Sequence, residues 1–402
     1  MSSSNVKHRI VIVGGGSAGI TVAARLRRSG ERDVAVLEPK TDHHYQPMWT
    51  LIGGGVGSTR AAVRPESSVM PKGVHWIKDA VTSIDPDKET VTTSGGLTVG
   101  YEYLVVCPGV QLNWEQLAGL EETLGRDGVC SVYRGDLAPV TWEMIRPLRS
   151  GTAIFAMPST PIKCPSVPQK LAYLAADWWR RRGVLENIHI VLAQPTPALL
   201  PVPEFAEQLA KVAQSYGIEV LLEHEVIEVS PEQREVVVVD HRGGAETKTT
   251  LHYDFLHAIP PHSAPDWLRQ GPLSDGTPTG YVAVNKNTLQ HVRFANVFAL
   301  GDAANTPNRK TAASVRKQAP VVVHNLRAAI RREPLPESYD GYAACPFTTR
   351  RNRVLMAEFD YSLKPRPSVP LINTKQERYD MWLLTRYGLV VLYWKLMLNG
   401  LA

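Results

Sequence analysis

The chain opens with a short run of β-branched residues, Ile10-Val11-Ile12-Val13. A continuous apolar run of this length is typical of a strand that is buried on both faces of a parallel sheet. A helical pattern follows over residues 18–29, and a second apolar run follows over residues 34–37. The order strand, helix, strand predicts a βαβ unit, because parallel neighbours need a crossover connection.

A similar arrangement returns in the middle of the chain. Strand patterns at 151–157 and 188–193 flank a helical pattern at 168–182, and a long helical pattern runs from Ala312 to Ile330. Further strand patterns lie at 217–229, 235–240, 253–260 and 296–300. Together they predict an α/β fold with two Rossmann-like (three-layer ββα) domains. The predicted limits are 1–112 and 263–335 for the two parts of the dinucleotide-binding domain, 113–262 for the second Rossmann-like domain, and 336–402 for a C-terminal region.

The last segment, residues 376–399, is rich in apolar and aromatic side chains, but Arg386 and Lys395 interrupt it. No uncharged run there approaches the roughly 20 residues that a membrane-spanning helix needs. Gly388 predicts two short helices, each with an apolar face that suits attachment to a membrane surface. A helix of the core or of a dimer interface has the same pattern, so both interpretations stay open.

Composition and charge exclude several classes of protein. The 402 residues are 44 % hydrophobic and 21 % charged, as in a folded globular protein. A formal net charge of +5 is too small for a protein that neutralises many phosphates, so no nucleic-acid partner is expected. The N-terminal residues lead directly into the first strand, and no signal or transit peptide is expected.

A glycine-rich turn joins the first strand to the first helix. In the run Gly14-Gly15-Gly16-Ser17-Ala18-Gly19, the first glycine permits a tight turn and Gly16 lets a pyrophosphate approach the backbone. Gly19 lets the helix pack closely on the strand. Glu38-Pro39 ends the second strand about 20 residues later, where a carboxylate accepts from ribose hydroxyls. The motif predicts a dinucleotide site and leaves FAD and NAD both open.

The middle βαβ unit has no such turn. Its first strand is followed by Pro158-Ser159-Thr160-Pro161-Ile162-Lys163-Cys164-Pro165, which contains no glycine. Prolines cannot shape the tight turn, and they lack the N–H groups that would bind a phosphate. We therefore predict that NAD(P)H is not the electron donor.

The four cysteines, Cys107, Cys130, Cys164 and Cys345, are widely and irregularly spaced. They form neither a zinc pattern nor a dense disulfide framework, and no metal site is expected. A redox pair drawn from distant parts of the chain stays open. Cys107 and Cys130 are expected in the core, since free cysteines are among the most buried residues.

Two further segments, 296–303 and 101–109, resemble the remaining FAD signatures of the pyridine nucleotide-disulphide reductase-like flavoproteins. That resemblance implies FAD, with the aspartate of the Gly-Asp pair on its ribityl chain and the following helix directed at the flavin. The positive end of a helix stabilises an anionic reduced flavin. The further cofactor contacts that we expect are Gln46, Pro108, Gly109, Gly301, Asp302, Ala312 and Lys317.

Several stretches carry a closer resemblance: residues 44–51, Pro161-Ile162-Lys163-Cys164 with Pro168-Gln169-Lys170, residues 316–320, and Cys345-Pro346. The chain is identified on these as a member of the sulfide:quinone oxidoreductases, similar to the type II branch that includes the mitochondrial enzymes. The resemblance implies that Cys164 and Cys345 are bridged by a disulfide or trisulfide, which hydrosulfide attacks. Cys345 would then carry a persulfide, and Cys164 would pass electrons to the flavin. Lys163 is expected to favour the thiolate, although a neighbour in an extended loop often points the other way.

The resemblance also implies a membrane quinone, with Gln318 and Phe347 as its expected contacts. The sulfur would leave as polysulfide or to a small acceptor such as sulfite, glutathione or another thiol. Attachment would be peripheral (monotopic), at the bacterial inner membrane, with a homodimer as one option. An NADH:quinone oxidoreductase of the same superfamily and a non-catalytic flavin-binding sensor are the alternative functions.

Overall fold

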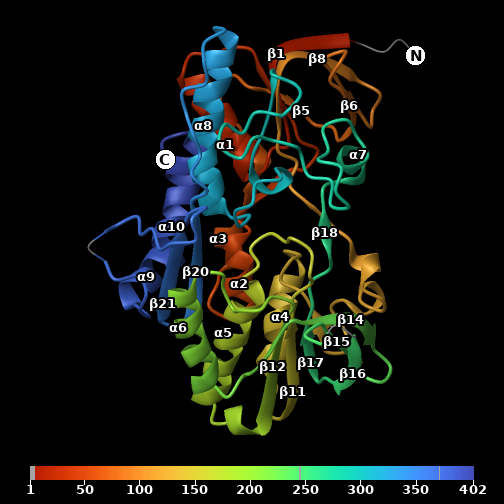
Figure 1. Cartoon of the computed structure of the whole chain (residues 1–402), viewed down its shortest axis with the longest axis vertical. Coiled ribbons are helices and arrows are strands. Elements are labelled where there is room, and N and C mark those ends of the chain that lie inside the picture. Colours follow the sequence, from red (N-terminus) through yellow and green to blue (C-terminus); the bar gives the residue numbers. More distant parts are fainter. Residues whose placement is uncertain (1–4, 244–245, 371) are drawn as a thin grey trace.

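The computed structural model describes residues 5–243, 246–370 and 372–402. Two sheets follow one another along the long axis of the molecule, and the C-terminal segment runs along one side of both (Figure 1). The predicted α/β class with Rossmann-like units is confirmed. The domain limits given above stay a prediction.

The first sheet has the strand order β5-β2-β1-β8-β7-β6, and β19 pairs with β8. Its strands are β1 (Asn5–Val13), β2 (Val34–Leu37), β5 (His75–Ile77), β6 (Val81–Asp85), β7 (Thr90–Thr93), β8 (Thr98–Val106) and β19 (Val297–Ala299). The two helices that pack against each other beside this sheet are α1 (Ser17–Arg28) and α8 (Ala312–Ile330). β1 begins earlier than its apolar run predicts, because it pairs with β8 from Asn5 onwards.

The second sheet is parallel and has the order β10-β17-β11-β12-β13. Its strands are β10 (Val129–Cys130), β11 (Gly151–Ala156), β12 (Ile188–Gln194), β13 (Glu219–Leu222) and β17 (Phe255–His257). The helices of this half are α4 (Leu137–Ile145), α5 (Val167–Arg181) and α6 (Pro203–Ser215). The strand expected at 217–229 is two strands, because Glu223 has a positive φ of 59° and the chain turns there into another sheet.

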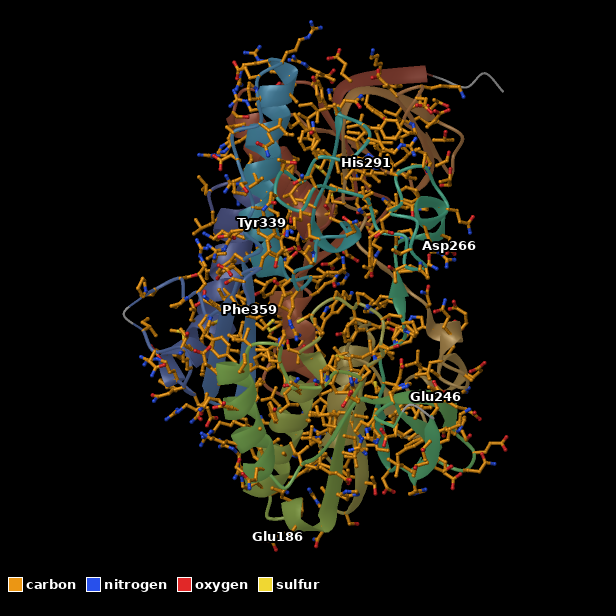
Figure 2. All side chains as sticks on the ribbon, in the orientation of Figure 1. Glu186, Glu246, Asp266, His291, Tyr339 and Phe359 are labelled. Carbon is orange, nitrogen blue, oxygen red and sulfur yellow. The ribbon has the colours of Figure 1, made fainter. Side chains whose placement is uncertain are left out.

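That other sheet is antiparallel and consists of β14 (His224–Ser230), β15 (Glu235–Asp240) and β16 (Thr247–His252). The shorter elements are β3 (Asp42–His44), α2 (Pro47–Gly53), α3 (Thr59–Ala62), β4 (Val63–Pro65), β9 (Gln111–Leu112), β18 (His262–Ser263) and α7 (Asp266–Arg269). β9 and β18 pair with each other where the chain passes between the two halves (Figure 1). Side chains fill the space between these layers (Figure 2).

The C-terminal region begins with the hairpin β20 (Ala343–Arg350) and β21 (Arg353–Phe359). It ends in one helical run over residues 379–399, which contains α9 (Tyr379–Leu383), α10 (Leu389–Val391), two π-helical turns and a final 3₁₀ turn. The expectation of two helices separated at Gly388 is wrong. Gly388 has helical angles, φ −64° and ψ −47°, so the run continues through it.

The two faces of this helical run differ. The buried face packs on α1 and on the hairpin through Met381, Trp382, Tyr393, Trp394, Met397 and Leu398. The opposite face leaves apolar side chains exposed, namely Tyr379, Leu383, Leu384, Tyr387, Val391 and Leu396. Within the described residues, no helix is long and apolar enough to cross a membrane.

Candidate active site

A cavity of about 520 Å³ lies where the two halves and the C-terminal region meet. Its wall is formed by the glycine turn, the end of β2, α2, the loop before α5, the start of α8, the hairpin and the helical run. A volume of this size suits a ligand with several rings. Ten of the predicted cofactor residues line it: Gly16, Ser17, Ala18, Glu38, Gln46, Pro108, Gly109, Gly301, Asp302 and Ala312.

The glycine turn has the geometry of a phosphate site. Gly14 has a φ of 101°, and a Cβ there would lie 2.5 Å from the carbonyl oxygen of Cys107. A Cβ on Gly19 would collide with the carbonyl of Gly14, which is the close packing expected of that glycine. A Cβ on Gly16 would meet nothing within 4 Å, so the space over the start of α1 is open. Open space at a helix N-terminus fits a pyrophosphate.

Two buried carboxylates lie beside this turn. Glu38 accepts hydrogen bonds from the backbone N–H of Gly15 (2.7 Å) and of Lys40 (2.8 Å). Glu66 lies 3.0 Å from the His43 ring through one oxygen, and its other oxygen, Oε1, has no hydrogen-bond partner in the described structure. Glu66 is only 2 % exposed and lines the cavity. A buried acceptor without a donor is costly, so the site fits a ligand that carries hydroxyl groups here.

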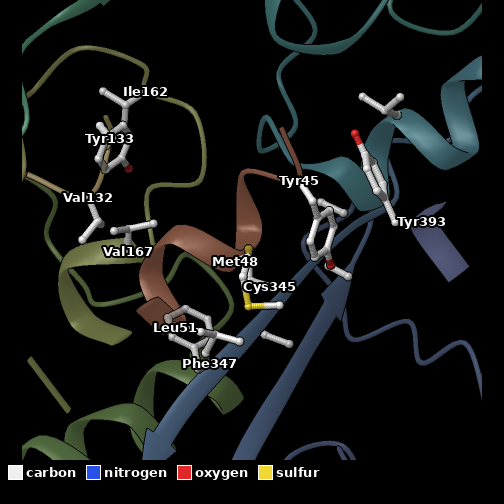
Figure 3. Packing of buried hydrophobic residues seen from close by; sticks show 14 of the residues in the cluster. Tyr45, Met48, Leu51, Val132, Tyr133, Ile162, Val167, Cys345, Phe347 and Tyr393 are labelled. Atoms are coloured by element: carbon white, nitrogen blue, oxygen red, sulfur yellow. The ribbon is translucent and has the colours of Figure 1, made fainter. Parts of the chain in front are cut away.

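The C-terminal run closes this end of the cavity. The Tyr393 hydroxyl lies 2.7 Å from the Ser17 hydroxyl and 2.6 Å from His43 Nε2. Its ring packs against Tyr45, with the ring centroids 4.5 Å apart, and both side chains are seen in Figure 3. A chain of hydrogen bonds therefore links Glu66, His43 and Tyr393 to the glycine turn. The sequence gives no sign that residue 393 reaches residue 17.

The start of α8 forms another part of the cavity wall. Gly301 donates its N–H to Gln318 (2.9 Å), and Thr311 caps the helix by accepting from the N–H of Ser314 (3.2 Å). Burial raises the pKa of Asp302, while the charges of Lys310 and Lys163 oppose that effect. The N-terminus of α8 therefore faces the cavity at Ala312, as a flavin-binding helix requires.

The loop that carries Cys164 is held firmly on both sides. The Cys164 N–H donates to the carbonyl of Lys310 (2.9 Å). The Tyr133 hydroxyl donates to the carbonyls of Lys163 (2.8 Å) and Cys164 (3.1 Å). Cys164 has a φ of 45°, a left-handed conformation that is uncommon outside glycine. Strain of this kind is kept where the surroundings fix the position of a functional group.

Cys345 reaches the same place from β20. Its thiol is 1 % exposed and lies among Met48, Leu51 and Phe347 (Figure 3). Burial raises the pKa of Cys345, whereas the charges of Arg309 and Lys170 and a hydrogen bond from Ser166 act to lower it. The Ser166 hydroxyl is also 3.9 Å from Cys164 Sγ. The helix α5, which begins after this loop, packs on β20, and both thiols are free in this structure.

The lysine at this pair is Lys170 and not Lys163. Lys170 lies in α5, is 8 % exposed, and donates from Nζ to Cys164 Sγ at 3.5 Å. Lys163 instead donates from Nζ to Gln46 (2.8 Å), and burial lowers its pKa to about 8. The left-handed turn at Cys164 changes the direction of the chain, and α5, which begins at Val167, brings Lys170 back to the thiol. A lysine on the buried stretch of α5 is the signal that could have identified Lys170.

Several other predicted site residues do not line this cavity, and Cys345 is one of them, although its neighbours Ala344 and Pro346 do. Gln318 is 1 % exposed and holds Gly301. Phe347 is fully buried on the face of β20 that carries Cys345. Lys317 is exposed on α8 and lines a separate small cavity, and Pro39 is exposed beside Glu38. Gln318 and Phe347 are therefore not placed to touch a ligand of the main cavity.

The remaining cysteines are buried in the core, as expected. Cys130 is fully buried and accepts a hydrogen bond from Thr141 (3.0 Å). Cys107 is 5 % exposed beside the glycine turn, where burial raises its pKa.

Comparison with known proteins agrees with this geometry. Residues 8–134 match the family described as pyridine nucleotide-disulphide oxidoreductase. The chain is 38 % identical to the mitochondrial sulfide:quinone oxidoreductase of Dictyostelium discoideum over 395 residues, which is 98 % of this chain and 86 % of the relative. The chain belongs to the sulfide:quinone oxidoreductase family. A mitochondrial sulfide:quinone oxidoreductase of Mus musculus is 37 % identical over 98 % of this chain and 87 % of its own length.

A sulfide:quinone oxidoreductase structure from Aquifex aeolicus has the same fold, with a TM-score of 0.82 at 20 % identity, covering 98 % of this chain and 92 % of that one. This member of the family is thus a flavoprotein oxidoreductase. The relatives at 31–38 % identity are all named mitochondrial, so the comparisons do not support the expected bacterial inner membrane.

Proposed function

We propose that this protein oxidises hydrosulfide at Cys164 and Cys345 and passes two electrons through bound FAD to a membrane quinone. The observation that carries the proposal is that α5, whose Lys170 ammonium donates to Cys164 Sγ at 3.5 Å, packs on β20, the strand that carries Cys345. Cys164 itself lines the cavity that begins at the dinucleotide turn. Sulfur chemistry and a two-electron carrier therefore have adjoining sites.

The sulfur step exchanges one S–S bond for another. Hydrosulfide attacks the Cys345 sulfur of the bridge, so that Cys345 becomes a persulfide. Cys164 then leaves as a thiolate from a disulfide, or as a persulfide anion from a trisulfide. A leaving thiolate is stabilised by a nearby cation, and Lys170 is placed to supply it. The outer sulfur passes to sulfite, glutathione, another thiol or a growing polysulfide. Closing the bridge again then releases two electrons.

The residues around the cavity fit FAD. Gly16 and the start of α1 would hold the pyrophosphate, Glu38 and the free oxygen of Glu66 the ribose hydroxyls, and Asp302 the ribityl chain. Bound FAD supplies a two-electron acceptor beside the cysteine pair and a donor to the quinone. The start of α8 would stabilise negative charge on the reduced ring.

We assign the quinone site and the membrane contact to the side of the cavity that the helical run forms. Its apolar lining there includes Met356, Met381 and Leu389. The exposed side chains on the outer face of the run would enter the interfacial layer of a membrane, where Tyr and basic residues are favoured. Peripheral attachment would bring the cavity next to the hydrocarbon in which a quinone dissolves.

Anaerobic titration of the purified holoenzyme with sulfide tests the proposal. Sulfide should remove the oxidised-flavin absorbance, and a quinone should restore it. Cys164→Ser and Cys345→Ser should lose the response, whereas Cys130→Ser, which changes a thiol remote from the pair, should keep it. Reduction by NADH with no response to sulfide would favour the NADH:quinone oxidoreductase, and a response to neither would favour the flavin-binding sensor.

A further inference from the structure

The hairpin β20–β21 has two chemically different faces. Ala344, Pro346, Thr348, Met356 and Glu358 line the main cavity. These positions alternate along each strand, and Ala344 pairs directly with Glu358, so they share one face of the hairpin. Cys345 pairs with Ala357 and lies on the other face. The hairpin therefore presents its thiol to one side and a carboxyl group to the cavity.

Glu358 is buried, at 6 % exposure, and is tied to two hydroxyl groups. The Tyr342 hydroxyl donates to Glu358 Oε1 at 2.5 Å, and the Ser368 hydroxyl donates to the same oxygen at 2.6 Å. The two hydroxyl oxygens are 2.9 Å apart, and the Ser368 N–H donates to Oε2 at 3.1 Å. No lysine, arginine or histidine of the described structure forms a salt bridge with this carboxyl group.

The two hydroxyl groups also border a second, smaller cavity of about 140 Å³. Its other walls are Lys317, Asp340, Arg366 and Pro367. Ser368, Lys317 and Arg366 are exposed, so this cavity lies at the surface of the molecule. A continuous series of groups with exchangeable protons thus runs from the surface through Ser368 and Tyr342 to the carboxyl group in the main cavity.

The cavity beside Glu358 suits a long apolar ligand. Met356, Ile372, Met381, Leu384 and Leu389 form its wall toward the helical run. The three hydrogen bonds from Tyr342 and Ser368 offset the cost of burying this carboxyl group, and the two hydroxyl groups among them also give it a route for protons. A role in proton transfer explains why an acidic side chain, Glu358, lines this part of the cavity.

We infer that Glu358 donates a proton to the quinone during its reduction, an inference that rests on the proposed function. Reduction of a quinone to a quinol takes up two electrons and two protons. Bound FAD, once reduced, would supply two electrons and one proton as a hydride equivalent, and the Glu358 carboxyl group would supply the second proton to a quinone oxygen. Its carboxylate is then reprotonated from the surface through Ser368 and Tyr342, so that charge and atoms balance in each cycle.

The test separates the two half-reactions by stopped-flow mixing. Wild type and Glu358→Gln are reduced by sulfide and then mixed with a short-chain quinone. Glu358→Gln should be reduced at the wild-type rate and reoxidised roughly a hundredfold or more slowly, as for loss of a general acid. Added formate or acetate should restore part of that rate, which a purely structural defect would not allow.

A matched control is Glu377→Gln, because Glu377 pairs with Arg350 of the same hairpin (2.7 Å) but does not line the cavity. One readout is independent of turnover. Quenching of tryptophan fluorescence should give the same quinone affinity in wild type and in Glu358→Gln. If Glu358→Gln does not fold, the double variant Tyr342→Phe with Ser368→Ala interrupts the same route and should slow reoxidation.

Reoxidation of Glu358→Gln, or of that double variant, at the wild-type rate would overturn the inference. Equally slow reoxidation of Glu377→Gln would also overturn it. If sulfide fails to reduce the wild type, the proposed function fails instead, and the quinone step can still be measured after reduction with dithionite.

Discussion

Substitution of Lys170 tests the attack of hydrosulfide on the cysteine bridge most directly. Its Nζ donates to Cys164 Sγ at 3.5 Å, inside a helix face that is otherwise buried. Lys170→Met keeps the length and apolar stem of the side chain and removes only the charge. Hydrosulfide attack releases a thiolate at Cys164, so the variant should slow that step while leaving the bridge itself intact.

The size of the effect follows from the distance. Two unit charges 3.5 Å apart attract by about 5 kcal/mol at an effective dielectric constant of about 20, which is a ceiling for the loss. Hydrogen bonds to charged groups are worth about 1.5–3 kcal/mol net. Reduction of the flavin by sulfide should therefore be about 10- to 150-fold slower in Lys170→Met.

Stopped-flow absorbance of the flavin, with sulfide in excess and oxygen excluded, measures this rate. Lys170→Arg keeps the charge and should recover most of it. Lys163→Met is the informative comparison, because Lys163 is adjacent to Cys164 in sequence but binds Gln46. A Lys170→Met rate within about twofold of wild type, at full FAD content, would refute the assignment. A larger loss of this rate in Lys163→Met than in Lys170→Met would also refute the assignment.

Two further predictions concern the helical run. Tyr393→Phe removes the hydroxyl group that forms hydrogen bonds with Ser17 and His43, and so leaves buried polar groups without a partner. The variant should retain FAD about 5- to 30-fold more weakly, which the fluorescence of released FAD measures. Replacing the exposed Leu383, Tyr387 and Val391 together by serine should lower binding to anionic liposomes at least about tenfold, measured by co-sedimentation, without changing reduction by sulfide. Unchanged binding would place the membrane contact elsewhere.

The register of the hairpin explains why the quinone contacts could not be chosen from the sequence. Phe347 and Gln318 have side chains that suit a quinone, one apolar and one polar. Both lie in or close to the stretches that carry the family resemblance. Side chains alternate along a strand, however, and a shift of one residue moves them to the other face. Only the pairing of Ala344 with Glu358 shows which residues of the hairpin enter the cavity.

Local patterns determined the elements of the Rossmann units, the glycine turn and the position of Glu38, because each depends on neighbours within about 30 residues. The long helix from Ala312 to Ile330 was equally evident. Folding decided which of these groups meet. Lys170 reaches Cys164 because a left-handed turn redirects the chain before α5, and Tyr393 reaches Ser17 across nearly the whole sequence. Such contacts depend on how the layers pack, which periodicity along the chain does not encode.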